Sequence, residues 1–357
     1  MGVPRRMGIF KRDKCIVVSI KPGNSYIKPN KPFRNHSEPF NSTYLVFYGL
    51  DTFAAINLCG KVVAATNNQF RQWIFNVTSF LLSCPNNGTL DITFTPSPVA
   101  AVHSAESAKC PSCLGGYYDF PDIQYIRKQQ VDFAWDFAPA YGPVGIWQSV
   151  RAVQIQSDEI HVENSAVDIY RKGQVNNLPP DQSQPWVVNI SMDYMGQLPR
   201  DVSVQVRIED LSGRIVADTT LSDITIYENL PGRITGHMIM TEPVDLWWPV
   251  GYGAQTLYNF IIQIQDSNKM TLATVLKRTG FRTVVLNQRP ISNAEIALGI
   301  APGNKWNFEI NGNEVFCKGS SIVPPDAFWP RVTQDHIKDI FTSAIDSVSF
   351  LPLNFIS

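Results

Sequence analysis

Two carboxylate side chains held close together can act as acid and nucleophile, so paired carboxylates are the first candidates for catalysis in this sequence. Asp132 and Asp136 stand four residues apart in a segment whose pattern predicts an extended chain. The rise of a strand would separate them by about 13 Å, whereas carboxylates that work by double displacement lie about 5–5.5 Å apart. Glu309 and Glu314 flank a predicted turn, where hairpin side chains face solvent. The sequence predicts no catalytic carboxylate pair among these residues.

Cysteine and histidine residues give no sign of a metal site. Cys110 and Cys113 form a CxxC pair, but a zinc site needs four ligands, and no second CxxC pair or nearby histidine pair exists. The five histidines have no metal-like spacing. We expect the CxxC pair to be a disulfide within a loop or two free thiols, and we expect no metal.

Five Asn-x-Ser/Thr sequences match the acceptor pattern for N-glycosylation: Asn35, Asn41, Asn76, Asn87 and Asn189. This density favours a secreted protein, although such sequences also arise by chance. No signal peptide is predicted, because the apolar stretch from Cys15 to Ile20 is too short and lacks a small-residue cleavage site. A chain with the sequons of a secreted protein but no signal peptide is predicted to have an incomplete N-terminus.

The overall composition is that of a folded protein. Hydrophobic residues make up 44% of the 357 and charged residues 17%, which excludes an intrinsically disordered chain. The net charge of −1 gives no general attraction to nucleic acid or to an anionic membrane, and no apolar run is long enough for a transmembrane helix. Aromatic residues at 11% and 25 prolines favour β-sandwiches with long loops over helical bundles.

Strand patterns dominate most of the chain. Between 41 and 155 short strands are interrupted by a long loop after Pro96, and the segment Gln124 to Phe133 is predicted to be extended. Between 160 and 287 several strands have the spacing of an immunoglobulin-like (Ig-like) sandwich.

The pattern changes near the C-terminus. A hairpin is predicted around the turn Asn311-Gly312. Thr333 can cap a following helix, whose apolar residues recur at helical spacing. These residues are Ile337, Ile340, Phe341, Ala344 and Ile345. A strand, a loop and a helix in this order are typical of the first unit of a larger α/β domain.

Four short segments of the sequence, called strings below, resemble segments of a single glycosidase family. The first comprises Tyr48–Ala54 (YGLDTFA) and Leu58–Lys61 (LCGK), similar to a strand pair of that family's sugar-binding domain. The second runs from Arg127 to Pro139 (RKQQVDFAWDFAP) and continues with Gly145–Trp147 (GIW). It resembles the family's stretch around a Trp-Asp-Trp motif.

The third string comprises Leu246–Tyr258 (LWWPVGYGAQTLY) and Gly280–Arg282 (GFR), similar to the end of the family's Ig-like domain. The fourth comprises Phe308–Gly319 (FEINGNEVFCKG) and Pro324–Thr333 (PPDAFWPRVT), similar to the entry into its catalytic barrel. In this order, the four strings resemble the β-mannosidases of glycoside hydrolase family 2, and most of all those of the fungal secreted type.

The resemblance implies a mainly β chain with four parts. These are an atypical N-terminal segment at 1–40, a partial sugar-binding jelly-roll domain at 41–158, an Ig-like β-sandwich at 159–288, and the truncated start of a (β/α)8 catalytic barrel at 289–357. It also implies a retaining exo-glycosidase that releases terminal β-D-mannose from the non-reducing end of manno-oligosaccharides or glycans, without a cofactor. No nucleic acid or membrane partner is expected, and the oligomeric state stays open.

The resemblance also assigns the site residues. Both catalytic glutamates would lie beyond Ser357, so the chain by itself is predicted to be inactive. Asp136 would accept hydrogen bonds from vicinal sugar hydroxyls while Trp135 packs on the sugar. Alternatively, Trp135 and Phe137 anchor the core and Asp136 caps a loop. Phe137 and Ala138 replace the family's second Trp and Gly.

Other residues near the ends of the strings are assigned weaker roles. Ser321 and Ile322 depart from the family pattern at the barrel entry, and Pro324 and Asp326 are expected to shape the loop that follows rather than to touch sugar. Trp247 and Trp248 are expected to pack a domain interface.

Both ends depart from the family pattern, at residues 1–40 and 346–357, so the chain is predicted to be a fragment or the product of wrong exon boundaries. Its parent would be secreted. The competing hypothesis is a non-catalytic carbohydrate-binding or adhesion protein built from two β-sandwiches. A β-galactosidase or β-glucuronidase is disfavoured by the Trp-Asp-Phe and Trp-Trp-Pro-Val-Gly-Tyr-Gly strings.

Overall fold

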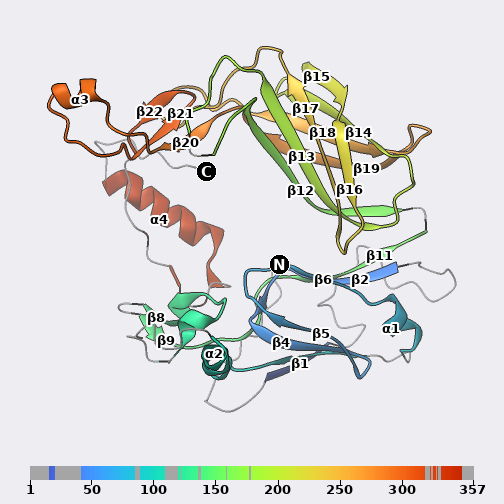
Figure 1. Ribbon diagram of the computed structural model, residues 1–357. Coiled ribbons are helices and arrows are strands. Elements are labelled where there is room, and N and C mark those ends of the chain that lie inside the picture. Colours follow the sequence, from blue (N-terminus) through green and yellow to red (C-terminus); the bar gives the residue numbers. More distant parts are fainter. Residues whose placement is uncertain are drawn as a thin grey trace. The chain divides into compact units, whose positions relative to one another are not determined.

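The computed structural model is mainly β, which confirms the predicted class (Figure 1). The residues it describes are 16–20, 42–84, 89–108, 120, 122–135, 138–157, 159–176, 178–317, 322, 325–326, 328 and 331–347. The chain divides into two compact units, the first made of 1–157 with 322–339 and the second of 158–321 with 340–357.

Besides the short pair β8 (Phe133–Trp135) and β9 (Ala138–Ala140), the described part of the first unit has three sheets, with strand orders β1-β7-β4-β5, β11-β2-β6 and β10-β3. Their strands are β1 (Ile16–Ile20), β2 (Ser42–Phe47), β3 (Leu50–Asp51), β4 (Phe53–Leu58), β5 (Lys61–Asn67), β6 (Trp73–Asn76), β7 (Leu90–Phe94), β10 (Gly145–Ile146) and β11 (Val150–Ile155). Along β4 and β7 every second residue is buried, as the two-residue period of a strand requires. Their inward side chains join Phe47 in one apolar core.

Two helices and two helical turns interrupt these strands. Part of the loop predicted after Pro96 is instead α2 (Ser97–Glu106), which has a proline in its first turn and buries three alanines. A first-turn proline loses no intrahelical hydrogen bond, and alanine is the strongest helix former. The extended segment predicted from Gln124 is also wrong, because η1 (Ile123–Tyr125) and η2 (Gln130–Asp132) are short 3-10 helices.

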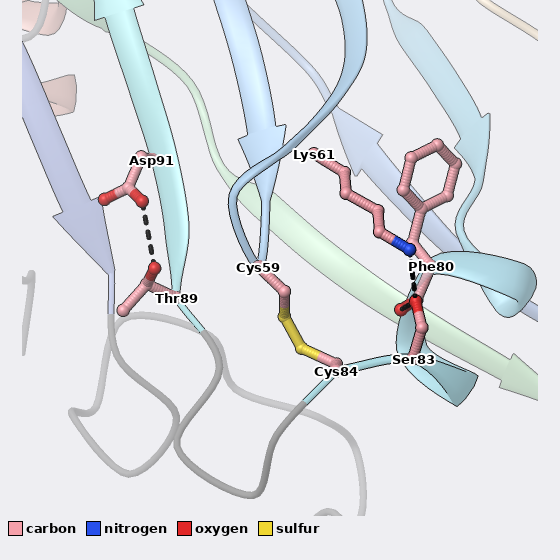
Figure 2. The surroundings of a disulfide bond; sticks show 7 residues. All are labelled: Cys59, Lys61, Phe80, Ser83, Cys84, Thr89 and Asp91. Carbon is pink, nitrogen blue, oxygen red and sulfur yellow. Dashed lines mark hydrogen bonds between the residues drawn. A yellow bond between two sulfur atoms is a disulfide. The ribbon is translucent and has the colours of Figure 1, made fainter.

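A disulfide ties the turn after β4 to the end of α1 (Thr78–Leu82). Cys59 and Cys84 are bonded across 25 positions of the sequence. Figure 2 shows the bond beside a second link between the same two segments, the hydrogen bond from Lys61 Nζ to Ser83 Oγ at 2.9 Å. This pairing could not be predicted from the spacing of the cysteines, because it depends on the approach of the two segments in space.

The second unit contains the sandwich predicted between 160 and 287. Its two four-stranded sheets have the orders β12-β13-β17-β16 and β15-β14-β18-β19. The strands are β12 (Ile160–Arg171), β13 (Trp186–Gly196), β14 (Ser203–Asp210), β15 (Ile215–Thr220), β16 (Ser222–Tyr227), β17 (Gly232–Met240), β18 (Tyr258–Gln265) and β19 (Thr271–Thr279). Phe281 is fully buried, with its ring centre 5.6 Å from that of Trp186 and 5.2 Å from that of Tyr258. The buried side chains around it form one large apolar core.

A small sheet and a helix follow. The sheet β20-β21-β22 comprises Val284–Asn287, Asn307–Ile310 and Asn313–Val315, and α3 (Asn293–Ala297) lies between β20 and β21 in the sequence. The predicted hairpin turn is confirmed, with φ of 51° at Asn311 and 80° at Gly312.

The predicted C-terminal helix is confirmed as α4 (Gln334–Ser347). Thr333 Oγ1 accepts the His336 N–H at 3.1 Å, as expected of an N-cap. Ile337, Ile340 and Phe341 are partly buried on the predicted apolar face.

Candidate functional site

The second string forms a short hairpin in the first unit. Strand β8 (Phe133–Trp135) pairs antiparallel with β9 (Ala138–Ala140), Phe133 opposite Ala140 and Trp135 opposite Ala138. Asp136 and Phe137, which connect these strands in the sequence, lie outside the described residues, as does the side chain of Trp135. The substrate-binding roles of Trp135 and Asp136 therefore stay predictions, while the described hairpin defines the candidate site.

Packing fixes one end of the hairpin. The Phe133 ring is fully buried and meets the Phe120 ring edge-on, with centres 5.9 Å apart. Ala101 of α2 and Ile123 of η1 lie in the same small cluster. Ala134 has φ of 80°, which a residue with a Cβ rarely adopts, so the surroundings must hold this strand in place.

A buried group of three charges lies next to the hairpin. Lys128 Nζ is 2.6 and 2.5 Å from the two carboxylate oxygens of Asp51 in β3, and 2.6 Å from Asp132 Oδ2. The exposed fractions of the side chains are 0% for Lys128, 0% for Asp51 and 3% for Asp132. We call these three residues the Lys128 cluster. With all three ionised it holds one uncompensated negative charge.

The carboxylates of the Lys128 cluster have further donors. Thr52 Oγ1 donates to Asp51 Oδ1 at 2.5 Å, and Gln129 Nε2 donates to Asp132 Oδ1 at 3.1 Å. Burial nevertheless raises the pKa of Asp51, and it raises the pKa of Asp132 to about 6, against the opposing attraction of Lys128. Both carboxylates are almost completely buried, so we assign this cluster to the structure around it rather than to chemistry on a substrate.

The backbone of Asp132 closes the base of the hairpin. Its carbonyl oxygen accepts the N–H groups of Tyr141 and Gly142 at 3.0 and 2.8 Å. The residue before β8 and the two residues after β9 are thereby joined. Beyond this junction the Tyr141 ring lies 4.9 Å, centre to centre, from that of Phe328 in the fourth string. Segments almost 190 positions apart thus meet beside the hairpin.

The fourth string is shaped by an ion pair. Asp326 accepts the Phe328 N–H at 2.6 Å and pairs with the Arg331 guanidinium at 2.7 Å. Hydrogen bonds from Arg331 lower the pKa of the Asp326 carboxyl. These contacts use Asp326 to fix its own loop, in keeping with the expected shaping role. Pro324 and Ser321 lie outside the described residues.

The third string is a packing feature of the second unit. Trp247 is buried, the Arg282 guanidinium lies 4.4 Å from the centre of its ring, and its carbonyl accepts a hydrogen bond from Asn311 Nδ2 at 2.9 Å. Asn311 Oδ1 also accepts the Thr283 N–H at 3.0 Å. One buried asparagine thus ties the small sheet to the sandwich.

The predicted modification sites fall into two groups. Asn76, at the end of β6, is exposed, whereas Asn189 is partly buried in the middle of β13. Asn35, Asn41 and Asn87 lie outside the described residues, as do Cys110 and Cys113.

In the part of the chain that the structure describes, Cys317 is an exposed free thiol. No cluster of metal-ligating side chains occurs among these residues, and none of their helices is long and apolar enough to cross a membrane.

The Lys128 cluster was not foreseen from the sequence. A lysine beside an arginine reads as a solvated basic pair, since lysine is almost never fully buried without a partner. The spacing of Lys128 and Asp132, four residues apart, was the available signal. The third member, Asp51, comes from 77 positions away and could not be paired with Lys128 without the fold.

Comparison with known proteins matches both units. Residues 29–148 match the family model described as "Glycosyl hydrolase 2 galactose-binding domain-like", and residues 177–282 match "Glycosyl hydrolases family 2". The first match covers the hairpin and the Lys128 cluster, and the second covers most of the Ig-like sandwich.

Curated relatives carry the name "Beta-mannosidase A". The protein of Aspergillus aculeatus is 47% identical over 315 residues, which are 86% of this chain and 33% of the relative. That of Aspergillus niger is 44% identical over 322 residues, 88% of this chain and 34% of the relative. The chain therefore spans about a third of the length of the curated relatives it matches.

Two solved glycosidase structures are similar to this chain. A β-D-mannosidase from Dictyoglomus thermophilum matches with a TM-score of 0.67 and 25% identity, over 94% of this chain and 36% of the other. A Bifidobacterium dentium β-glucuronidase matches with a TM-score of 0.55 at 17% identity, over 93% and 47%, which shows the shared fold alone. The chain thus belongs to glycoside hydrolase family 2, as a relative of its β-mannosidases.

Proposed function

We propose that this chain is the sugar-binding and Ig-like part of a β-mannosidase that releases terminal β-D-mannose from the non-reducing end of manno-oligosaccharides or glycans, with retention of configuration. The observation that carries the proposal is the identity of 44–47% to proteins named β-mannosidase A over most of this chain. By the family resemblance both catalytic glutamates belong to a part of the family's barrel that these 357 residues do not include, so we expect the 357 residues alone to lack hydrolytic activity.

Within this function, Asp136 and Trp135 are proposed to hold the terminal sugar. The support is indirect: the strands on either side pair closely, and the base of their hairpin is fixed by the Asp132 carbonyl. A carboxylate at such a place can accept hydrogen bonds from two neighbouring hydroxyls, while an aromatic ring covers an apolar sugar face.

We further propose that the parent protein is secreted. Disulfides persist in oxidising compartments, and Cys59–Cys84 is such a bond. The exposed Asn76 sequon supports the same location, since N-glycosylation requires entry into the secretory pathway.

The activity is tested with a hybrid in which this chain replaces the matching 315-residue segment of the Aspergillus aculeatus protein. The hybrid is expected to hydrolyse p-nitrophenyl β-D-mannoside in preference to the corresponding glucoside and galactoside, while the 357-residue chain shows no turnover above a mock purification. A folded hybrid that prefers another glycoside would overturn the mannosidase proposal. An inactive hybrid, together with binding of manno-oligosaccharides by the chain alone, would support the non-catalytic alternative.

The role of Asp136 is tested in the same hybrid. Asp136→Ala and Asp136→Asn each remove a charged acceptor worth about 1.5–3 kcal/mol, so kcat/KM should fall by about tenfold to a hundredfold with an unchanged melting temperature. Asp201→Ala, at an exposed position of the second unit, serves as control. A large fall in melting temperature with intact kinetics would make Asp136 a structural cap.

A further inference from the structure

The Lys128 cluster is a buried charged group that the proposed chemistry does not use. It spans two elements, since Asp51 belongs to β3 of the sandwich whereas Lys128 and Asp132 belong to the segment that leads into the hairpin. A fully buried lysine flanked by two carboxylates is an expensive arrangement compared with an apolar core. Apolar residues of similar size would hold these segments together, but they would not fix one orientation.

The bonds of the cluster converge on one residue. The Asp132 side chain is held by Lys128 at 2.6 Å and by Gln129 at 3.1 Å, and its carbonyl holds Tyr141 and Gly142. Asp132 therefore connects the sandwich, through Lys128 and Asp51, to both ends of the β8–β9 hairpin.

A second layer of bonds holds the segment from the other side. Gln69 is buried; its Oε1 accepts the Gln129 N–H at 2.8 Å, and its carbonyl accepts the Trp147 indole N–H at 3.1 Å. The Lys128 ammonium also lies 5.8 Å from the centre of the Phe133 ring, in the first residue of β8. The hairpin is thus located by directional bonds at its base, and the unfavourable φ of Ala134 is maintained just beyond them.

We infer that Asp132, through its bonds to Lys128, is a positioning residue for the substrate: it sets the place of the β8–β9 hairpin, and so of the sugar-binding residues that the hairpin carries. This inference rests on the proposed mannosidase function for its kinetic part, but the placement of the hairpin can be measured without any activity. The cluster acts through the hairpin and touches no substrate itself.

The first experiment uses the 357-residue chain. Amide hydrogen exchange is measured by NMR for Tyr141 and Gly142 in wild type, Asp132→Ala and Asp132→Asn. Asp132→Ala leaves Lys128 paired with Asp51 and keeps the Asp132 carbonyl, but it removes the side-chain bonds to Lys128 and Gln129 that hold this carbonyl in place. Exchange of both amides should therefore accelerate at least tenfold. Asp132→Asn keeps a hydrogen-bonding side chain and should restore most of the protection. Ile92→Val, a mild cavity change in the core of the same sandwich, is the matched control and should leave these two amides unchanged.

The second experiment puts the same variants into the hybrid enzyme. Asp132→Ala should lower kcat/KM for the mannoside at least tenfold, Asp132→Asn by less than threefold, and Ile92→Val by less than twofold. Faster exchange in Asp132→Ala with unchanged kcat/KM would overturn the positioning role, although the anchor itself would stand. Unchanged exchange would overturn the anchor. A hybrid that is inactive with the wild-type segment counts against the proposed function, and the exchange data then decide the anchor separately.

Discussion

The two sandwiches of this chain are held together in different ways. The Ig-like sandwich has a large apolar core, in which Phe281 packs among the rings of Trp186, Tyr258 and Phe260. The first unit has an apolar core of its own but also buries the Lys128 cluster. In the Ig-like sandwich the ion pair of Arg207 with Asp218 lies at the surface, and in the pair of His161 with Glu163 only the carboxylate is buried.

This contrast follows from what each part of the fold requires, a fixed orientation in the hairpin and cohesion alone in the sandwich. Apolar burial is strong but indifferent to orientation, so it suffices for two sheets whose strand pairing already fixes their geometry. A hairpin of two three-residue strands has little pairing of its own. Directional charged bonds at its base supply the missing geometry, at a cost in desolvation.

Removing the central charge should give the largest effect. Lys128→Met leaves two buried carboxylates without their cation, and breaking such a group costs about 3–5 kcal/mol. Chemical denaturation should show that loss. Proteolysis should cut the first unit earlier while the Ig-like sandwich keeps its resistance. Lys172→Met makes the same charge change at an exposed position of the second unit and should cost less than about 0.5 kcal/mol. Equal losses from both variants would abolish the contrast between buried and exposed charge.

Opening the disulfide should come next. A cross-link that closes a loop of this size stabilises by about 3.5 kcal/mol, mainly by restricting the unfolded chain. The double variant Cys59→Ser, Cys84→Ser should lose about that much free energy of unfolding, measured by chemical denaturation. Its stability should no longer change when reductant is added. Cys317→Ser, at the exposed free thiol, should change nothing. A wild-type protein that is indifferent to reductant would argue against the bond.

Lowering the pH should stabilise the folded chain, because it protonates the buried Asp132 carboxylate. The pKa of Asp132 is raised from 3.8 to about 6 in the folded chain, so between these values the folded state binds more protons than the unfolded state. The stability from this group is fully present below pH 4 and is lost as the pH rises through 6, by about 3 kcal/mol in all. Asp132→Asn cannot ionise, so relative to wild type it should gain about that amount between pH 4 and pH 7. Parallel stability curves would contradict the raised pKa.

Breaking a surface pair in the Ig-like sandwich should have the smallest effect. Arg207 and Asp218 form a half-exposed pair at 2.9 Å, and such pairs contribute about 0.2–1 kcal/mol. Arg207→Ala should therefore lower stability by less than about 1 kcal/mol, and less still at high salt. A loss comparable to that of Lys128→Met would mean that the Ig-like sandwich also depends on its charges.

Much of the fold could be read from local patterns. Alternation along β4 and β7, the Asn311-Gly312 turn and the spacing of Ile337, Ile340 and Phe341 each state a local preference that the structure realises. The helix α2 was missed because two prolines near its start outweighed the alanines that follow. The resemblance of the four strings to family 2 β-mannosidases is confirmed by the comparisons.

The β class, the family and the string that holds Trp135 and Asp136 could be inferred from the sequence, because they depend on residues close together in the chain. Three features appear only in the folded chain: the bond between Cys59 and Cys84, the contact of Tyr141 with Phe328, and the burial of Lys128 between two carboxylates. The physical reason is that burial and pairing belong to contacts between distant segments. Whether a lysine is a solvated charge or the centre of a buried cluster depends on what the fold brings to it.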